Sequence, residues 1–102
     1  MSSLDHKIFS IFFLMLLYFS CDHNAKETVI DAAALYKKKC VLCHGADGKM
    51  GLNGAKELPL SQLTVGERIK IIQQGKNLMP SFKEQLTFEQ IKAIAEFTMH
   101  FK

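Results

Sequence analysis

The sequence predicts an all-α fold of three to four short helices, and three observations lead to that class. The chain has 102 residues, enough for one small domain. Two segments, beginning at Thr64 and Thr87, carry the Ser/Thr-x-x-Glu/Gln pattern of a helix capping box and lead into apolar residues at helical spacing. No window shows the sustained alternation of apolar and polar residues that is typical of a half-buried strand.

The composition limits the classes of function. Apolar residues make up 48% of the chain and charged residues 23%, which is typical of a globular protein and not of a disordered one. The formal net charge is +3, and Arg68 is the sole arginine of the sequence. Because nucleic-acid binding relies on clustered basic charge and on bidentate guanidinium groups, we expect no nucleic-acid partner.

The first element is an apolar run typical of an export signal. Residues 8–19 are almost entirely apolar, Lys7 precedes them, and a polar stretch follows at residues 22–27. A helix of these 12 residues spans about 18 Å, less than the roughly 30 Å of a bilayer core, so a membrane span is disfavoured. We interpret residues 1–20 as a signal peptide.

Cys21 directly follows this run and the small residue Ser20, an arrangement that resembles the lipobox of bacterial lipoproteins. Tyr18 and Phe19 depart from the leucine and small residue usual there, so an ordinary secretory leader is the alternative. Lipidation would make Cys21 the N-terminus of the mature chain and would explain its third cysteine. The sequence then predicts a membrane anchor at Cys21, with residues 21–27 as a short tether.

The next helix is predicted from about Thr28 into residues 40–44. Ala32, Leu35, Tyr36, Cys40 and Cys43 form its apolar stripe, and the lysines at positions 37–39 are expected to point outward.

Residues 40–44 read Cys40-Val41-Leu42-Cys43-His44, the C-x-x-C-H pattern of c-type haem attachment. Cysteines three apart lie on one side of a helical turn, where both can reach the two vinyl groups of one porphyrin. His44 follows as the proximal iron ligand. Zinc binding lacks a paired fourth ligand and a redox dithiol lacks a preceding strand, so both are lesser alternatives.

The middle helix opens at the Thr64 capping box, continues through Ile69, Ile71 and Ile72, and is predicted to stop at Gly75. The segment that follows reads Gly-Lys-Asn-Leu-Met-Pro-Ser-Phe and resembles class I cytochromes c, which bind the iron through a methionine in a Met-Pro loop. The resemblance covers residues 28–101 and implies the cytochrome c fold around one covalently attached haem c, with Met79 as the second axial ligand. His100 or an empty sixth position is the fallback.

The last helix opens at the Thr87 capping box, with Phe88, Ile91, Ile94, Ala95, Thr98 and Phe101 on one face. In the resembled family the first and last helices cross, which implies that Ala32 and Tyr36 meet Phe97. The family also accepts the hydrogen bond of the proximal histidine on a backbone carbonyl. Here that acceptor stays open between residues 55 and 59.

These features predict a monohaem electron carrier and not an enzyme, because an iron with two protein ligands has no open position for substrate. One alternative is a haem-based sensor or gas-binding domain with a displaceable Met79. Another is an accessory domain, residues 28–102, that donates electrons to a periplasmic oxidoreductase.

The expected location is the periplasmic side of a bacterial membrane, lipid-anchored. The expected partners are redox proteins such as a terminal oxidase. Basic residues that would steer them lie near the haem motif and the methionine loop, although an ordinary solvated face would look the same: Lys37, Lys38, Lys39, Lys76 and Lys83.

Overall fold

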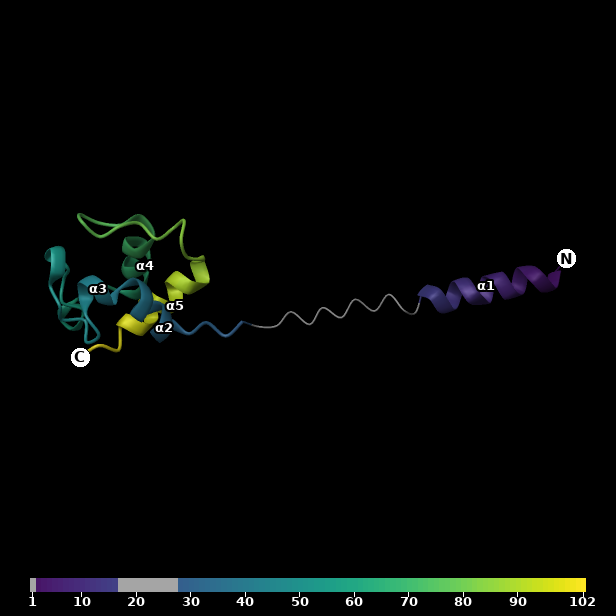
Figure 1. The fold of residues 1–102 in the computed structure, drawn as a ribbon, viewed down its shortest axis with the longest axis horizontal. Coiled ribbons are helices and arrows are strands. Elements are labelled where there is room, and N and C mark those ends of the chain that lie inside the picture. The colour runs from purple at the N-terminus through teal and green to yellow at the C-terminus, as the bar shows by residue number, and fades with distance from the viewer. Residues whose placement is uncertain (1, 17–27) are drawn as a thin grey trace.

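The computed structural model of the chain describes residues 2–16 and 28–102 (Figure 1). Within them the elements are helical: α1 (Ser2–Leu16), α2 (Ala32–Lys39), α3 (Val41–His44), α4 (Val65–Gln74), α5 (Phe88–Thr98), and the short 3₁₀ turns η1 (Leu52–Gly54) and η2 (Leu58–Leu60). The described residues form no strand, and their one isolated bridge joins Lys76 to Met79. The predicted all-α class is confirmed.

Helix α1 contains most of the predicted signal peptide. The side chains of residues 4–15 in this helix are all exposed. None of the described helices combines the length and the apolarity needed to cross a membrane. Cys21 and the predicted cleavage site lie outside the described residues.

Helix α2 begins later than the sequence predicted. Its N-cap is Asp31, whose side chain accepts a hydrogen bond from the backbone N–H of Ala34 at 3.0 Å. Residues 28–30 precede the helix, so the predicted start at Thr28 is wrong. An aspartate is a good N-cap, and here it acts without the Glu or Gln that completes a capping box.

Helices α4 and α5 begin where the capping boxes predicted. Thr64 accepts from the N–H of Glu67 at 3.2 Å, and the Glu67 carboxylate accepts from the Thr64 N–H at 2.7 Å. Thr87 and Gln90 make the same reciprocal pair at the start of α5. Gly75 closes α4 at a φ of +73°, as expected of a glycine that ends a helix.

The core forms where α2 and α4 both pack against α5. The ring centroids of Tyr36 and Phe97 lie 5.4 Å apart, and Phe101 completes the aromatic group at 5.1 Å from Tyr36 and 5.5 Å from Phe97. The predicted meeting of the first and last helices is therefore confirmed. The buried apolar side chains are Tyr36, Ile72, Phe82, Leu86, Ile91, Ile94 and Ala95.

Phe88 was predicted on the buried face of α5 and is instead 52% exposed. It is the first residue of the helix, and side chains on a helix lean toward its N-terminus. Phe88 therefore points past the edge of the packed region, while Ile91 and Ile94, on the same face, are fully buried.

Candidate functional site

The C-x-x-C-H segment occupies the turn between α2 and the end of α3. Cys40 ends α2 and precedes α3, and its carbonyl accepts from the N–H of Cys43 at 3.3 Å and from that of His44 at 3.0 Å. Cys40 and Cys43 are both half-buried and both free thiols. One turn of helix thus carries two thiols and one imidazole, which is the donor set that covalent haem requires.

His44 is oriented by a backbone carbonyl. Its ring Nδ1 lies 3.2 Å from the carbonyl oxygen of Lys56, which occupies Nδ1 as a donor and leaves Nε2 free to bind a metal. Burial lowers the pKa of His44, and the Lys56 bond acts in the opposite direction. The sequence analysis could place the backbone acceptor for the His44 ring only between residues 55 and 59. In the structure this acceptor is the carbonyl of Lys56.

A second contact, which sequence reasoning missed, supports the same turn. The Tyr36 hydroxyl donates to the carbonyl oxygen of Gly45 at 2.7 Å, immediately after His44. Gly45 has a φ of +78° and is buried, so the chain reverses tightly at this point. Burial raises the pKa of Tyr36 to about 12, so the hydroxyl keeps its proton and remains a donor.

The loop that carries Met79 is fastened to the end of α4. Lys76 and Met79 exchange both backbone hydrogen bonds at 3.0 Å. Beyond Met79, the N–H of Phe82 donates to the Ile72 carbonyl at 3.0 Å, and the Ser81 hydroxyl donates to the Gln73 carbonyl. The arm that follows Met79 is therefore held by the last turn of α4, and the arm that precedes it continues from Gly75 at the end of that helix.

Gly75 permits this attachment because the loop crosses directly over it. A Cβ at position 75 would lie 2.6 Å from the Met79 carbonyl oxygen and 2.8 Å from the Ser81 nitrogen. Contacts under 3.0 Å force something to move. Any residue other than glycine at position 75 would force the methionine loop or the end of α4 to shift.

Met79 is less exposed than the alternative ligands. It is half-buried and packs against the core, whereas Met50 and Met99 are 51% and 44% exposed and His100 is exposed. The N–H of Met50 donates to the His44 carbonyl at 2.9 Å, which keeps the backbone of Met50 beside His44. Within residues 2–16 and 28–102, no group of three or more His, Cys, Asp or Glu side chains is gathered as a zinc site would require.

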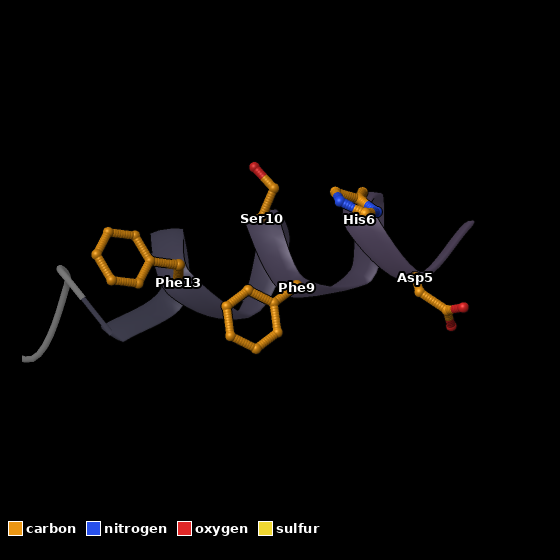
Figure 2. A pocket seen from close by; sticks show the side chains of 5 residues that line it. All are labelled: Asp5, His6, Phe9, Ser10 and Phe13. Atoms are coloured by element: carbon orange, nitrogen blue, oxygen red, sulfur yellow. The ribbon is translucent and has the colours of Figure 1, made fainter. Parts of the chain in front are cut away.

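A separate pocket lies on the surface of α1 (Figure 2). Its five lining residues, Asp5, His6, Phe9, Ser10 and Phe13, all come from that helix and all are exposed. One helix face alone cannot enclose a ligand, so this pocket is not part of the candidate site.

The chain is similar to proteins of one family. The family model described as cytochrome c oxidase, cbb3-type, subunit III, matches residues 27–97. A cytochrome c6 of Leptolyngbya boryana is 32% identical, with 68% of this chain and 91% of that protein covered. A cytochrome c6 of Rippkaea orientalis is 29% identical, with 91% of each covered.

A solved structure agrees with these sequence matches. The c-type cytochrome KustC0563 superimposes with a TM-score of 0.64 at 34% identity, covering 72% of this chain and 99% of that one. The family match at residues 27–97 includes both cysteines of the C-x-x-C-H segment, His44 and Met79. The chain therefore belongs to the cytochrome c family, and its cofactor is covalently bound haem c.

Proposed function

We propose that this protein is a monohaem c-type cytochrome that carries one electron at a time. In this proposal Cys40 and Cys43 attach the haem, and His44 and Met79 are the axial ligands. The observation that carries it is the orientation of His44, whose Nδ1 is taken by the Lys56 carbonyl and whose Nε2 is left for the iron. When bound, the haem supplies reversible one-electron exchange at its iron.

The protein's own residues fix the ligand positions. Lys56 and Tyr36 hold the turn around His44, while the last turn of α4 holds the Met79 loop. Two protein ligands leave no iron position open to a substrate, which supports a carrier and not an enzyme. A thioether ligand favours the reduced iron, so the Met79 loop would also set a raised reduction potential.

The basic residues that lie near the haem motif and the methionine loop in the sequence support docking to an acidic partner. Lys37, Lys38, Lys76 and Lys83 are exposed, so their charges are available to a partner surface. Lys39 differs, because it is half-buried and its Nζ donates to Gln85 Oε1 at 3.1 Å. Such a positive surface would steer acidic redox proteins toward the haem.

A second candidate function is that of an electron donor attached to a larger oxidase. The observation that favours it is the matching family model, which describes a subunit of a cbb3-type cytochrome c oxidase. In both functions the haem transfers single electrons, and the two differ in the partner. A stable complex with an oxidase would identify the donor, and a freely exchanging domain would identify the carrier.

For the location we propose export and lipid anchoring at Cys21. The exposed apolar helix α1 and the Ser20-Cys21 pair support a signal peptide of the lipoprotein type. The mature domain, residues 28–102, would then lie at the periplasmic face of a bacterial membrane.

The test of the haem function is a visible spectrum of protein made in cells able to attach haem c. It is recorded oxidised, reduced, and reduced under carbon monoxide, followed by extraction with acidified acetone. We expect haem that resists extraction and a low-spin reduced spectrum that carbon monoxide does not change. Rapid carbon monoxide binding would favour a sensor or gas-binding domain, and extractable haem would overturn the assignment of Cys40 and Cys43.

A further inference from the structure

Lys39 differs from the neighbouring lysines of α2 in having a partner far along the chain. Lys38, the residue before it, is exposed, whereas Lys39 is half-buried. The Nζ of Lys39 donates to the Oε1 of Gln85 at 3.1 Å, although the two residues are 46 positions apart in the sequence. Within the described residues the recorded ion pair is Lys92 with Glu96, so the partner of Lys39 is a neutral amide.

Gln85 lies in the turn that follows the methionine loop. The N–H groups of Gln85 and Leu86 both donate to the Phe82 carbonyl at 3.0 Å. Phe82 and Leu86 are buried, and the N–H of Phe82 donates to the Ile72 carbonyl at the end of α4. Gln85 therefore belongs to the hydrogen-bonded arm that continues from Met79.

Lys39 lies at the opposite end of the candidate site. It is the last residue of α2 and directly precedes Cys40, the first of the two proposed haem-attaching cysteines. The N–H of Cys40 donates to the Tyr36 carbonyl at 2.8 Å, so the attachment turn continues from α2. The bond from Lys39 to Gln85 thus joins the cysteine side of the site to the methionine side. Backbone contacts hold the methionine loop to α4, and Lys39 adds a contact from a second helix.

We infer that Lys39 is a positioning residue that holds the Met79 loop closed through its hydrogen bond to Gln85. A thioether is a weak iron ligand, so the iron keeps it only while the loop stays in place. When the loop moves away from the iron, its arm moves away from α2 and the bond to Lys39 breaks. That bond therefore lowers the population of the open state. The inference rests on the haem site proposed above.

The experiment measures how fast imidazole replaces Met79 on the oxidised iron of the holoprotein, followed by the visible spectrum. Imidazole can bind only after Met79 leaves, so at saturating imidazole the observed rate is that of loop opening. Lys39→Met removes the hydrogen-bond donor. Gln85→Ala removes the acceptor at an exposed position, and it tests the inference even if Lys39→Met is unstable. Lys38→Met is the matched control, because it removes the same charge from an exposed side chain.

We expect Lys39→Met and Gln85→Ala each to raise the opening rate about two- to tenfold, the range that a single hydrogen bond provides. The double variant should open no faster than either single variant, because both changes remove the same bond. Lys38→Met should keep the wild-type rate.

Gln85→Glu provides the opposite change. A carboxylate binds an ammonium group more strongly than a neutral amide does, so this variant should open more slowly than the wild type at low ionic strength. High salt should reduce the slowing, because the pair lies at the surface. Adding Lys39→Met to Gln85→Glu should abolish it.

Two outcomes would overturn the inference. One is a wild-type opening rate in either Lys39→Met or Gln85→Ala, since a lower melting temperature alone would make the contact purely structural. The other is an equally large increase in Lys38→Met, which would make the effect one of charge and not of the bond to Gln85. Failure of the proposed haem function would look different, because the wild-type protein itself would then lack covalent haem or bind carbon monoxide rapidly.

Discussion

His44 and Met79 are held by different kinds of contact. The imidazole of His44 is fixed through its own ring nitrogen, which bonds to the Lys56 carbonyl. Met79 is fixed through its backbone, which pairs with Lys76, and its side chain packs against the core. If His44 and Met79 are the iron ligands, as proposed, the weaker sulfur ligand depends more on the chain to keep it in place.

Met79→Ala tests the sulfur ligand. We expect the haem to stay covalently bound, the sixth iron position to open to carbon monoxide, and the reduction potential to fall, because the thioether favours reduced iron. The measurement is the reduced spectrum with and without carbon monoxide. Met50→Ala, at an exposed methionine, is the matched control. Unchanged ligation in Met79→Ala would mean that another residue binds the iron.

Tyr36→Phe tests the hydroxyl that holds the turn after His44. Below pH 10 we expect the variant to be less stable by about 1 kcal/mol, from loss of the hydrogen bond to Gly45. Unfolded tyrosine releases its proton near pH 10, whereas the folded pKa is about 12, so wild-type stability falls between these values. Tyr36→Phe has no hydroxyl to ionise, so its stability does not fall in this way over that pH range.

The stability difference between wild type and Tyr36→Phe should therefore shrink, and then reverse, as pH rises. The two-unit shift corresponds to roughly 2 to 3 kcal/mol across that window. Denaturant unfolding of both proteins at pH 8 and pH 11.5 measures the difference in their free energies of unfolding. Contributions from titrating groups that the two proteins share cancel in this difference. A difference that stays constant with pH would contradict the burial of this hydroxyl.

At the scale of the elements, Gly75 and Gly54 differ in whether a side chain at that position would meet neighbouring atoms. Gly75 and Gly54 both have positive φ, at +73° and +76°, but a Cβ at Gly54 would meet no atom within 4 Å. Alanine is strained by the positive φ at both positions, and Gly75, with a ψ of 168°, lies in a backbone region that is essentially restricted to glycine. Only alanine at position 75 would also meet atoms of the Met79 loop.

We therefore expect Gly75→Ala to weaken methionine ligation and Gly54→Ala, where a Cβ meets no neighbouring atom, to preserve it. Carbon monoxide binding to the reduced haem measures the difference, with thermal unfolding to compare stability. Equal carbon monoxide binding in the two variants would show that the loop does not depend on its contact with Gly75.

Elements set by local pattern were predictable, and those set by tertiary contacts were not. The capping boxes at Thr64 and Thr87 are local, and they placed α4 and α5 correctly. Asp31 lacks the Glu or Gln that would have marked it, so the start of α2 was missed. The burial of Arg68 depends on carbonyls supplied by two other segments, the loop before α4 and the end of α5, and a charged residue on a helix carries no local sign of such partners.

In the candidate site, too, the residues marked by a local sequence pattern were predictable and the tertiary contacts were not. Cys40, Cys43, His44 and Met79 stand out by spacing and resemblance, and their assignment stays a prediction. The acceptor for His44 could be narrowed to residues 55–59 but not chosen, because every residue offers a backbone carbonyl. The hydrogen bond from the Tyr36 hydroxyl to Gly45 could not be predicted either, since packing alone explains a tyrosine in an apolar stripe.

For the whole molecule, the charge distribution predicts a salt-dependent encounter with partners. Exposed Lys37, Lys38, Lys76 and Lys83 should accelerate electron transfer to an acidic acceptor at low ionic strength, since long-range attraction raises the association rate. Stopped-flow mixing with a series of salt concentrations measures this. Charge-neutralising variants at Lys76 and Lys83 should flatten the salt dependence, and Lys92→Gln on α5 is the control. A rate independent of salt would exclude electrostatic steering.

Cys21→Ala tests the proposed membrane anchor. We expect the mature domain to move from the membrane fraction to the soluble fraction with its visible spectrum unchanged, because lipidation requires the cysteine thiol and the haem site does not. Fractionation followed by immunoblotting measures the distribution, with Ser20→Ala, another small residue, as the control that keeps the anchor. Continued retention of Cys21→Ala in the membrane fraction would refute lipid anchoring.

The packing of α2 against α5 also imposes an order on biosynthesis. Phe97 follows Tyr36 by more than fifty residues in the chain, yet their rings are in contact in the core. A chain made from its N-terminus cannot close this core before α5 has been synthesised. Until then residues 40–44 stay accessible on an open chain. Haem attachment can thus precede closure of the fold, and the thioether bonds keep the cofactor in place while the helices assemble around it.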